Sequence, residues 1–268
     1  MFNIVMYRDL PKRLWKKWWN IDKANKPDVL ILWGIFKSIA EEGYWSVPEF
    51  LKAQFEPYLT NIRQHTLPHT WIGERNGLKI AVSHAYGGAF SLDQAIQHAK
   101  LGAKLIILVG HFGGLKDGLT VGEIFIPSAA YRSDGASFHL LGKEDRFVYP
   151  TEEVEEWVKN HLRERKIPYQ SGIMKTVSTM VGQTKEMIDE WKRAGFTGVD
   201  LESGVIFSAA KKFGFKAAAI LHHSDHVGGG KLLPDATKKQ KEEKRKARRL
   251  LAELAINVAD RFGKDNGK

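Results

Sequence analysis

Two acidic residues in the C-terminal half of the chain stand beside apolar runs that have the composition of buried strands. Glu202 lies in the segment GVDLES, residues 198–203, and Asp225 follows the apolar run 217–221. Open α/β sheets place their chemistry at the carboxyl ends of parallel strands, so we expect the two carboxylates at one site. There, one carboxylate can stabilise a developing positive charge, and a carboxyl group with a raised pKa can act as a general acid. The alternative for Glu202 is an acid that stabilises a helix N-terminus through the macrodipole.

Three histidines surround Asp225, at positions 222, 223 and 226. Such a cluster is also compatible with a metal site, or with an aspartate that only caps a loop. Adjacent residues on a strand point to opposite faces, which argues against joint ligation by His222 and His223. We therefore predict no metal at this site.

Several motifs resemble signatures of one enzyme superfamily. Val-Asp-Leu-Glu-Ser at 199–203 is similar to the Val-Glu-Met-Glu-Ser/Ala signature of the hexameric nucleoside phosphorylases and nucleosidases. Ser224-Asp225-His226 resembles the Ser-Asp-His of their purine-specific branch. The glycine-rich phosphate region and Asp-Gly-Ala-Ser run of the uridine phosphorylases are matched by residues 109–114, 121–124 and 132–137. Their shared order makes the motifs specific together, although each alone is weak.

The resemblance implies cleavage of a nucleoside N-glycosidic bond. It assigns Glu202 to the ribose hydroxyls, with Leu201 beside it, and Asp225 to protonation of the base nitrogen N7. The purine branch pairs this Asp with a basic residue thirteen positions later, which here is Lys238. Met180 stands where relatives stack an aromatic ring on the base, and it offers a polarizable apolar surface instead. Uridine-cleaving relatives lack the Asp, so a purine-type base is favoured.

The resemblance fails at the nucleophile site. Phosphorylases hold phosphate with arginines, because the guanidinium fork matches phosphate oxygens. Two expected arginine positions, after Gly34 and before Gly110, are Ser38 and Leu108, and His111 replaces the Thr or Ser that follows the glycine.

Three interpretations stay open. Four residues, His111, His84, Lys37 and Arg63, could rebuild an anion site with inorganic phosphate as co-substrate; in the family one such arginine comes from a neighbouring subunit. Alternatively water is the nucleophile. In similar nucleosidases a glutamate near the end of the first strand activates it, but Glu41 and Glu42 lie later than that position, so the base is unidentified; His111, which titrates near neutrality, is an acceptable substitute. The third interpretation is a nucleoside-binding protein without turnover. Hydrolysis is marginally favoured over phosphorolysis.

The composition predicts one soluble enzyme domain over residues 1–268. The chain is 43% hydrophobic, has no cysteine, and contains no apolar run near the ~20 residues that a membrane span needs. Charges at positions 8, 9 and 12 interrupt any signal peptide. We therefore expect a cytoplasmic protein without an organic cofactor. The resemblance adds self-assembly, as a dimer or a trimer of dimers.

The net charge of +10 is concentrated in two segments. Residues 1–27 form a basic, Trp-rich extension, and residues 238–249 hold eight Lys or Arg against two Glu. A nucleic-acid-binding surface is one interpretation of such clusters. The second run continues into leucines at helical spacing, which favours the solvated face of an amphipathic C-terminal helix over 234–263.

The alternation of strands and helices predicts a central mixed, mostly parallel twisted sheet covered by helices on both faces. The expected strands are 28–33, 70–74, 78–82, 104–109, 124–130, the segment before Glu202 and 217–221, with a hairpin turn at Arg75-Asn76-Gly77. The expected helices are 47–58, 91–101 with Ser91 as N-cap, 151–165 with Thr151 as N-cap, 183–194 and 202–213.

Overall fold

The central sheet is built around strand β1, Val29–Gly34, whose side chains are buried on both faces. Val29 and Ile31 belong to one apolar core, and Leu30 and Leu32 belong to the other. A strand that is apolar at every position is typical of a sheet covered on both sides. The computed structural model describes residues 11–20, 25–35 and 46–267.

The remaining strands follow in chain order: β2 Thr60–Gln64, β3 Thr70–Arg75, β4 Leu78–Ala85, β5 Leu105–Gly114, β6 Ile124–Ser133, β7 Phe147–Val148, β8 Tyr169–Val177, β9 Gly198–Asp200 and β10 Lys216–Asp225. The helices are α1 Lys12–Trp18, α2 Val47–Phe55, α3 Gly88–Leu101, α4 Gly135–Leu141, α5 Glu152–Glu164, α6 Lys185–Arg193, α7 Ser203–Phe213 and α8 Lys238–Asp265, with short 3-10 turns η3 Val227–Gly229 and η4 Leu233–Asp235. No helix in the described part of the chain combines the length and apolar character that a bilayer crossing requires.

The sheet is mixed, and part of it closes on itself. Strands β4, β1, β5 and β10 are parallel neighbours, so their carboxyl ends share one edge. Strand β10 continues to β6, β8 and β9, and β9 pairs back antiparallel to the last residues of β5. The short β9 thus links β8 back to β5.

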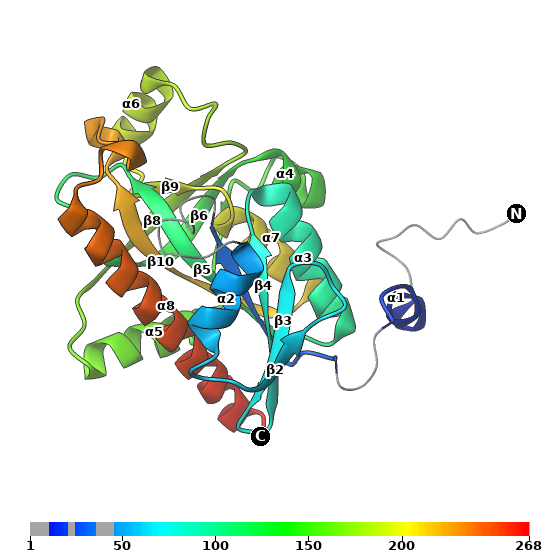
Figure 1. Ribbon diagram of the computed structural model, residues 1–268. Helices are drawn as coiled ribbons and strands as arrows, with labels where there is room; N and C mark the ends of the chain where they lie inside the picture. Colours follow the sequence, from blue (N-terminus) through cyan, green and yellow to red (C-terminus); the bar gives the residue numbers. More distant parts are fainter. Residues whose placement is uncertain (1–10, 21–24, 36–45, 268) are drawn as a thin grey trace, which may run out of the picture.

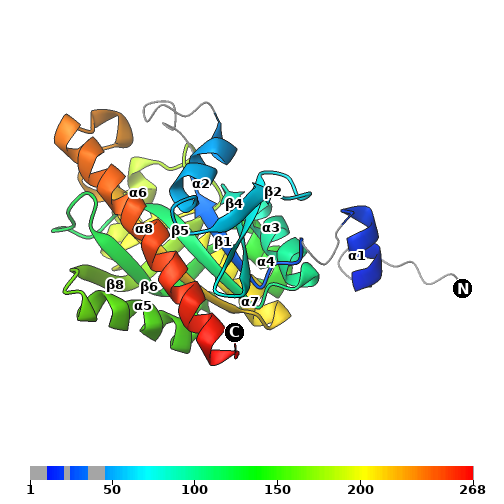
Figure 2. The ribbon, with the colours of Figure 1, turned by 60° about the horizontal axis from the view of Figure 1, so that its bottom comes forward.

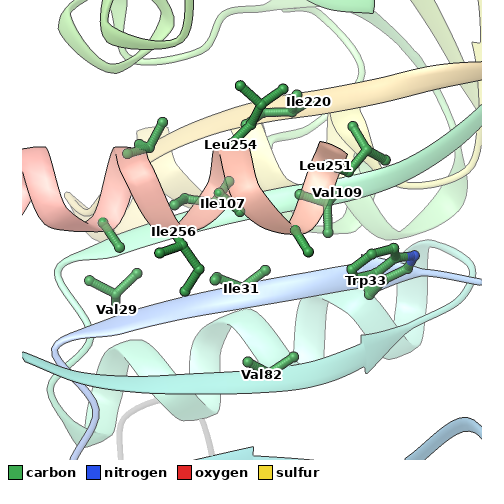
Figure 3. Packing of buried hydrophobic residues seen from close by; sticks show 14 of the residues in the cluster. Val29, Ile31, Trp33, Val82, Ile107, Val109, Ile220, Leu251, Leu254 and Ile256 are labelled. Atoms are coloured by element: carbon green, nitrogen blue, oxygen red, sulfur yellow. The ribbon is translucent and has the colours of Figure 1, made fainter. Parts of the chain in front are cut away.

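Helices cover the two faces as two layers (Figures 1 and 2). One face packs against α2, α5 and α8, and the other against α3, α4 and α7. Figure 3 shows Leu251 and Leu254 of α8 lying over Ile107, Val109 and Ile220 of the sheet. The predicted mixed sheet with helices on both faces is confirmed, and α8 is the predicted amphipathic helix.

Three local predictions need correction. The helix expected from Ser91 begins earlier, at Gly88, and Ser91 is buried inside it. Thr151 precedes α5, but its hydroxyl accepts from the Ala217 amide at 2.9 Å instead of capping the helix. Strand β8 was not predicted, because polar residues interrupt its apolar pattern.

The tryptophans of the N-terminal segment are divided between the core and solvent. Trp15 is buried, Trp19 packs against Leu67 and Leu101, and Trp18 stacks on both while half exposed. The rings thus form one stacked cluster around α1, and only part of it joins the core.

Truncation of the α8 core contact tests this packing. We expect Leu254→Ala to lower the free energy of unfolding by ~2–5 kcal/mol, because a fully buried leucine leaves a cavity. Exposed Arg249→Ala on the same helix should change it by no more than ~0.5 kcal/mol. Urea denaturation followed by circular dichroism measures both; equal effects would contradict the assigned face of α8.

Candidate active site

A cavity opens where β1, β5 and β10 end and β9 turns into α7. The described residues that line it include the two predicted ribose-binding residues, Leu201 and Glu202, and the predicted general acid, Asp225. The rest of the lining is Gly34, Tyr86, His111, Phe112, Gly113, Met180, Gln183, Val199, Asp200, Ser224, Val227 and Leu233. Residues far apart in the sequence thus form one site, as the spacing of the acidic residues predicts.

The two carboxylates reach this cavity by a different route from the one expected. Strand β9 is antiparallel to β5, whereas β10 is parallel to β5, so β9 and β10 are not parallel neighbours. They still converge, because β9 meets β5 at Gly113 and Gly114, the carboxyl end of that strand. The segment after β9, which carries Glu202, therefore begins near Gly113, where β10 ends with Asp225.

Glu202 is buried at the start of α7 and is held by backbone amides. Its Oε1 accepts from the Gly87 N–H at 2.7 Å, and its Oε2 accepts from the Leu201 N–H at 3.3 Å. Gly87 has φ 73° and ψ 156°, a conformation that only glycine adopts readily, and this conformation accompanies the amide contact. Burial raises the pKa of Glu202, and the neighbouring Asp200 raises it further.

Asp200 is a site residue to which the sequence assigned no role. Its Oδ1 accepts from Thr176 Oγ1 at 2.7 Å, and its Oδ2 accepts from the Ser203 N–H at 2.9 Å. It thereby caps the first turn of α7 and fixes the segment that carries Glu202. Burial raises its pKa. The signal was present as the first acid of the Val-Asp-Leu-Glu motif.

Asp225 ends β10 at a bulge opposite Gly113. The Ser224 hydroxyl donates to its Oδ1, and burial raises the pKa of the Asp225 carboxyl. The structure does not bring Lys238 to it: that side chain is exposed in the first turn of α8. The lysine of α8 whose charge acts on Asp225 is instead the buried Lys244, which the helical period turns toward the sheet.

His222 and His223 point to opposite faces of β10, as expected for adjacent residues on a strand. His222 lies beside His111, with ring centroids 6.1 Å apart, whereas His223 lies beside Phe112 at 5.4 Å, so the two neighbours face opposite sides of β10. Among the described residues no group of three or more His, Asp or Glu is arranged to hold a metal. The expectation that His111 titrates near neutrality is wrong, because burial and the charge of Lys244 lower its pKa to about 4.

Two glycines set the distance between strands at the site. A Cβ on Gly110 would lie 3.0 Å from the Gly34 carbonyl oxygen, and a Cβ on Gly34 would lie 3.5 Å from Glu202 Oε2. Glycine at these positions lets β5, β1 and the Glu202 carboxyl approach one another. Of the two predicted glycines, Gly34 lines the cavity, and Gly110 lies outside the lining and sets the spacing of β5 and β1.

The wall that Met180 was predicted to form is apolar. Met180 packs with Val177, Leu201 and Val227, and it lines the cavity together with Leu233. Gln183 is the amide side chain in this wall. A flat heterocycle would therefore meet aliphatic and thioether surface here.

The predicted anion-site cations are not gathered in the cavity. Arg63 lies on β2 and donates to Asn25 Oδ1 at 3.3 Å, and His84 contacts the Ile35 carbonyl oxygen through Nε2 at 2.8 Å. Neither belongs to the cavity lining, and that lining, as far as the structure describes it, contains no lysine or arginine. Four further candidates lie outside the described residues: Lys37, Ser38, Glu41 and Glu42.

The Asp-Gly-Ala-Ser run has a structural role. Asp134 caps α4 by accepting from the Ser137 amide at 2.7 Å. The buried Arg132 donates to the Ser137 and Gly142 carbonyl oxygens at 2.7 and 2.6 Å. These contacts hold the α4 turn next to α7, behind the site.

Comparisons with known proteins show the family of the chain. The family model described as "Phosphorylase superfamily" matches residues 56–262. A uridine phosphorylase of Haemophilus influenzae is 25% identical over 205 residues, covering 70% of this chain and 79% of the relative. A DeoD-type purine nucleoside phosphorylase of Vibrio cholerae is 26% identical over 161 residues, covering 60% and 67%.

Two solved structures share the fold. Uridine phosphorylase from Vibrio fischeri, in complex with 6-hydroxy-1-naphthoic acid, superposes with a TM-score of 0.74 at 18% identity, over 91% of this chain and 95% of that one. AMP nucleosidase from Bacteroides thetaiotaomicron superposes with a TM-score of 0.72 at 16% identity, over 96% and 99%.

The electrostatic link between Asp200 and Glu202 is directly testable. In Asp200→Asn a negative charge near Glu202 is removed, so we expect the pKa of Glu202 to fall while burial still holds it above that of an exposed glutamate. NMR titration of the glutamate carboxyl carbons measures the shift. Asp117→Asn, at an exposed aspartate, should leave the pKa of Glu202 unchanged; an unchanged value in Asp200→Asn as well would contradict the link.

Proposed function

The chain belongs to the phosphorylase superfamily, and on this premise we propose that it cleaves the N-glycosidic bond of a purine-type nucleoside with water as acceptor. One observation carries the proposal: Glu202 and Asp225 line one cavity whose described lining holds no lysine or arginine. The carboxylates supply what bond cleavage requires. The cations that would bind a phosphate dianion are not among those residues.

Glu202 is suited to the sugar. Cleavage develops positive charge on the ribosyl ring, and a carboxylate fixed in advance by the Gly87 and Leu201 amides stabilises that charge without reorganisation. The same oxygens can accept hydrogen bonds from the ribose hydroxyls. Burial favours the protonated form of Glu202 in the free protein, so its proton passes to solvent before the bond breaks, and the cationic transition state favours the carboxylate that results.

Asp225 is suited to the leaving base. Burial raises the pKa of the Asp225 carboxyl and so favours its protonated form, which can donate its proton to a ring nitrogen as the bond breaks. Met180, Val227 and Leu233 provide apolar surface for the heterocycle. Purine N7 is an acceptor that matches this donor.

Electrostatics favours water over phosphate. Three carboxyl groups, of Asp200, Glu202 and Asp225, line the cavity. A phosphate dianion buried among them needs compensating cations, because a buried charge without a partner is strongly disfavoured. Phosphorolysis is the second candidate, favoured by the activities named for the uridine and purine nucleoside phosphorylase relatives.

Other expectations stay predictions. These are an absence of organic cofactors, self-association into dimers or trimers of dimers, and a cytoplasmic location. Nucleic acid is not the proposed partner, because the basic run of α8 is the exposed face of a packed helix. In a binding protein without turnover, Glu202 and Asp225 would have no catalytic role.

A panel of purine and pyrimidine nucleosides, assayed with and without inorganic phosphate, tests the proposal. We expect release of free base and free sugar at a rate independent of phosphate, with purine nucleosides preferred. Glu202→Gln should lower the rate by ~10²–10³-fold for every substrate, because the transition-state charge loses its partner. Chromatography measures the products, and exposed Glu144→Gln is the matched control. Sugar 1-phosphate as the product would overturn hydrolysis.

The role of Asp225 predicts a dependence on the leaving group. Asp225→Asn should slow purine nucleoside cleavage by ~10²–10⁴-fold but barely affect a 4-nitrophenyl riboside, whose leaving group needs no proton. With purine nucleosides, wild-type activity should fall as pH rises through the raised pKa of Asp225, since the acid must be protonated. Exposed Asp145→Asn serves as control. An equal loss on both substrates would argue for a structural role.

A further inference from the structure

We propose that His111 is the general base that activates the attacking water, an assignment that rests on the proposed hydrolytic function. His111 lines the cavity together with Gly34 and Glu202. Gly34 lies next to Glu202, since an added Cβ on Gly34 would touch Glu202 Oε2. His111 therefore lines the same part of the cavity as the carboxylate that is assigned to the sugar. A water molecule held there would face the same ring as Glu202.

The backbone of β1 offers the His111 ring an acceptor. Gly110 brings β5 against Gly34, and the Gly34 carbonyl oxygen, which acts to raise the pKa of His111, is placed to accept from the His111 ring. A neutral imidazole has one N–H and one lone pair, so donation to this carbonyl leaves the other nitrogen as an acceptor. A ring held by a backbone carbonyl in this way is oriented for proton abstraction.

The groups around His111 keep it neutral. His222 faces it from β10, Lys244 acts on it from α8, and the carboxyl groups of Asp200, Glu202 and Asp225 lie around the cavity. Burial is the main cause that lowers the pKa of His111, to about 4, and Lys244 adds to it. The ring therefore has a free lone pair throughout the neutral range.

The other described titratable groups of the lining are committed elsewhere. Both oxygens of Glu202 accept from backbone amides, and both oxygens of Asp200 accept from Thr176 and Ser203. The pKa of Tyr86 is raised by burial, so the phenol keeps its proton. Asp225 is the proposed acid. Among the described lining residues, the group left to accept a proton is His111.

The proton balance closes over one turnover. As the C–N bond breaks, its electron pair stays with the base, which takes the Asp225 proton. The water oxygen bonds to the anomeric carbon, one O–H bond breaks, and that proton moves to the His111 ring nitrogen. Water becomes strongly acidic only as it joins the sugar cation, so a base of low pKa suffices late in the step. Solvent then removes the proton from His111 and returns one to Asp225.

Chemical rescue separates this role from a structural one. We expect His111→Ala to lower kcat for hydrolysis by ~10²–10⁴-fold and added imidazole to restore it, since the truncated side chain leaves a space of that size. Substituted imidazoles should restore the rate in proportion to their basicity, which a merely structural role would not produce. Exposed His139→Ala should retain full activity and show no response to imidazole.

Defined results would overturn the assignment. Wild-type kcat in both His111→Ala and His111→Gln would exclude it, as would a loss that imidazoles fail to restore in a variant with unchanged circular dichroism and thermal midpoint. A comparable loss in Glu41→Gln or Glu42→Gln, with His111→Ala active, would assign the base to those carboxylates. Failure of the proposed function is distinct, because then wild-type protein releases no base from any nucleoside.

Discussion

Withdrawal of three carboxyl groups from water is the constraint on which the site depends. Asp200, Glu202 and Asp225 share one cavity, where burial disfavours their charged forms. Backbone amides and hydroxyls satisfy the oxygens of Asp200 and Glu202, so the groups stay fixed without cations in the lining. A site of this kind responds to positive charge that develops during a reaction and resists a second anion. The proposed preference for water over phosphate rests on this one condition.

The scaffold serves this condition through close backbone approach. Gly34 and Gly110 let β1 and β5 meet beneath Glu202, and Gly87 presents its amide to the carboxylate from the end of β4. Strand β9 reaches the same edge by pairing with the last residues of β5. A side chain at Gly110 would press on the Gly34 carbonyl and so separate β5 from β1.

Helix α8 joins stability and electrostatics in one element. Leu251 and Leu254 anchor it across the sheet, while exposed lysines cover its outer face. Lys244 is the cation that the helical period turns inward, where it acts on His111, His222 and Asp225. The buried lysine helps to keep the histidines neutral, and it opposes the effect of burial on the pKa of Asp225.

Sequence by itself determined the alternating fold, the hairpin at Arg75-Asn76-Gly77, the amphipathic α8, and the identities of Glu202 and Asp225, because periodicity and short motifs are local properties of the chain. Tertiary structure decided what depends on distant segments. Lys244 and not Lys238 acts on Asp225, since the direction of a helical side chain follows from how the helix packs. The low pKa of His111 arises from burial by other strands, and the role of Asp200 from Thr176 on β8, a strand whose polar residues hid it from pattern analysis.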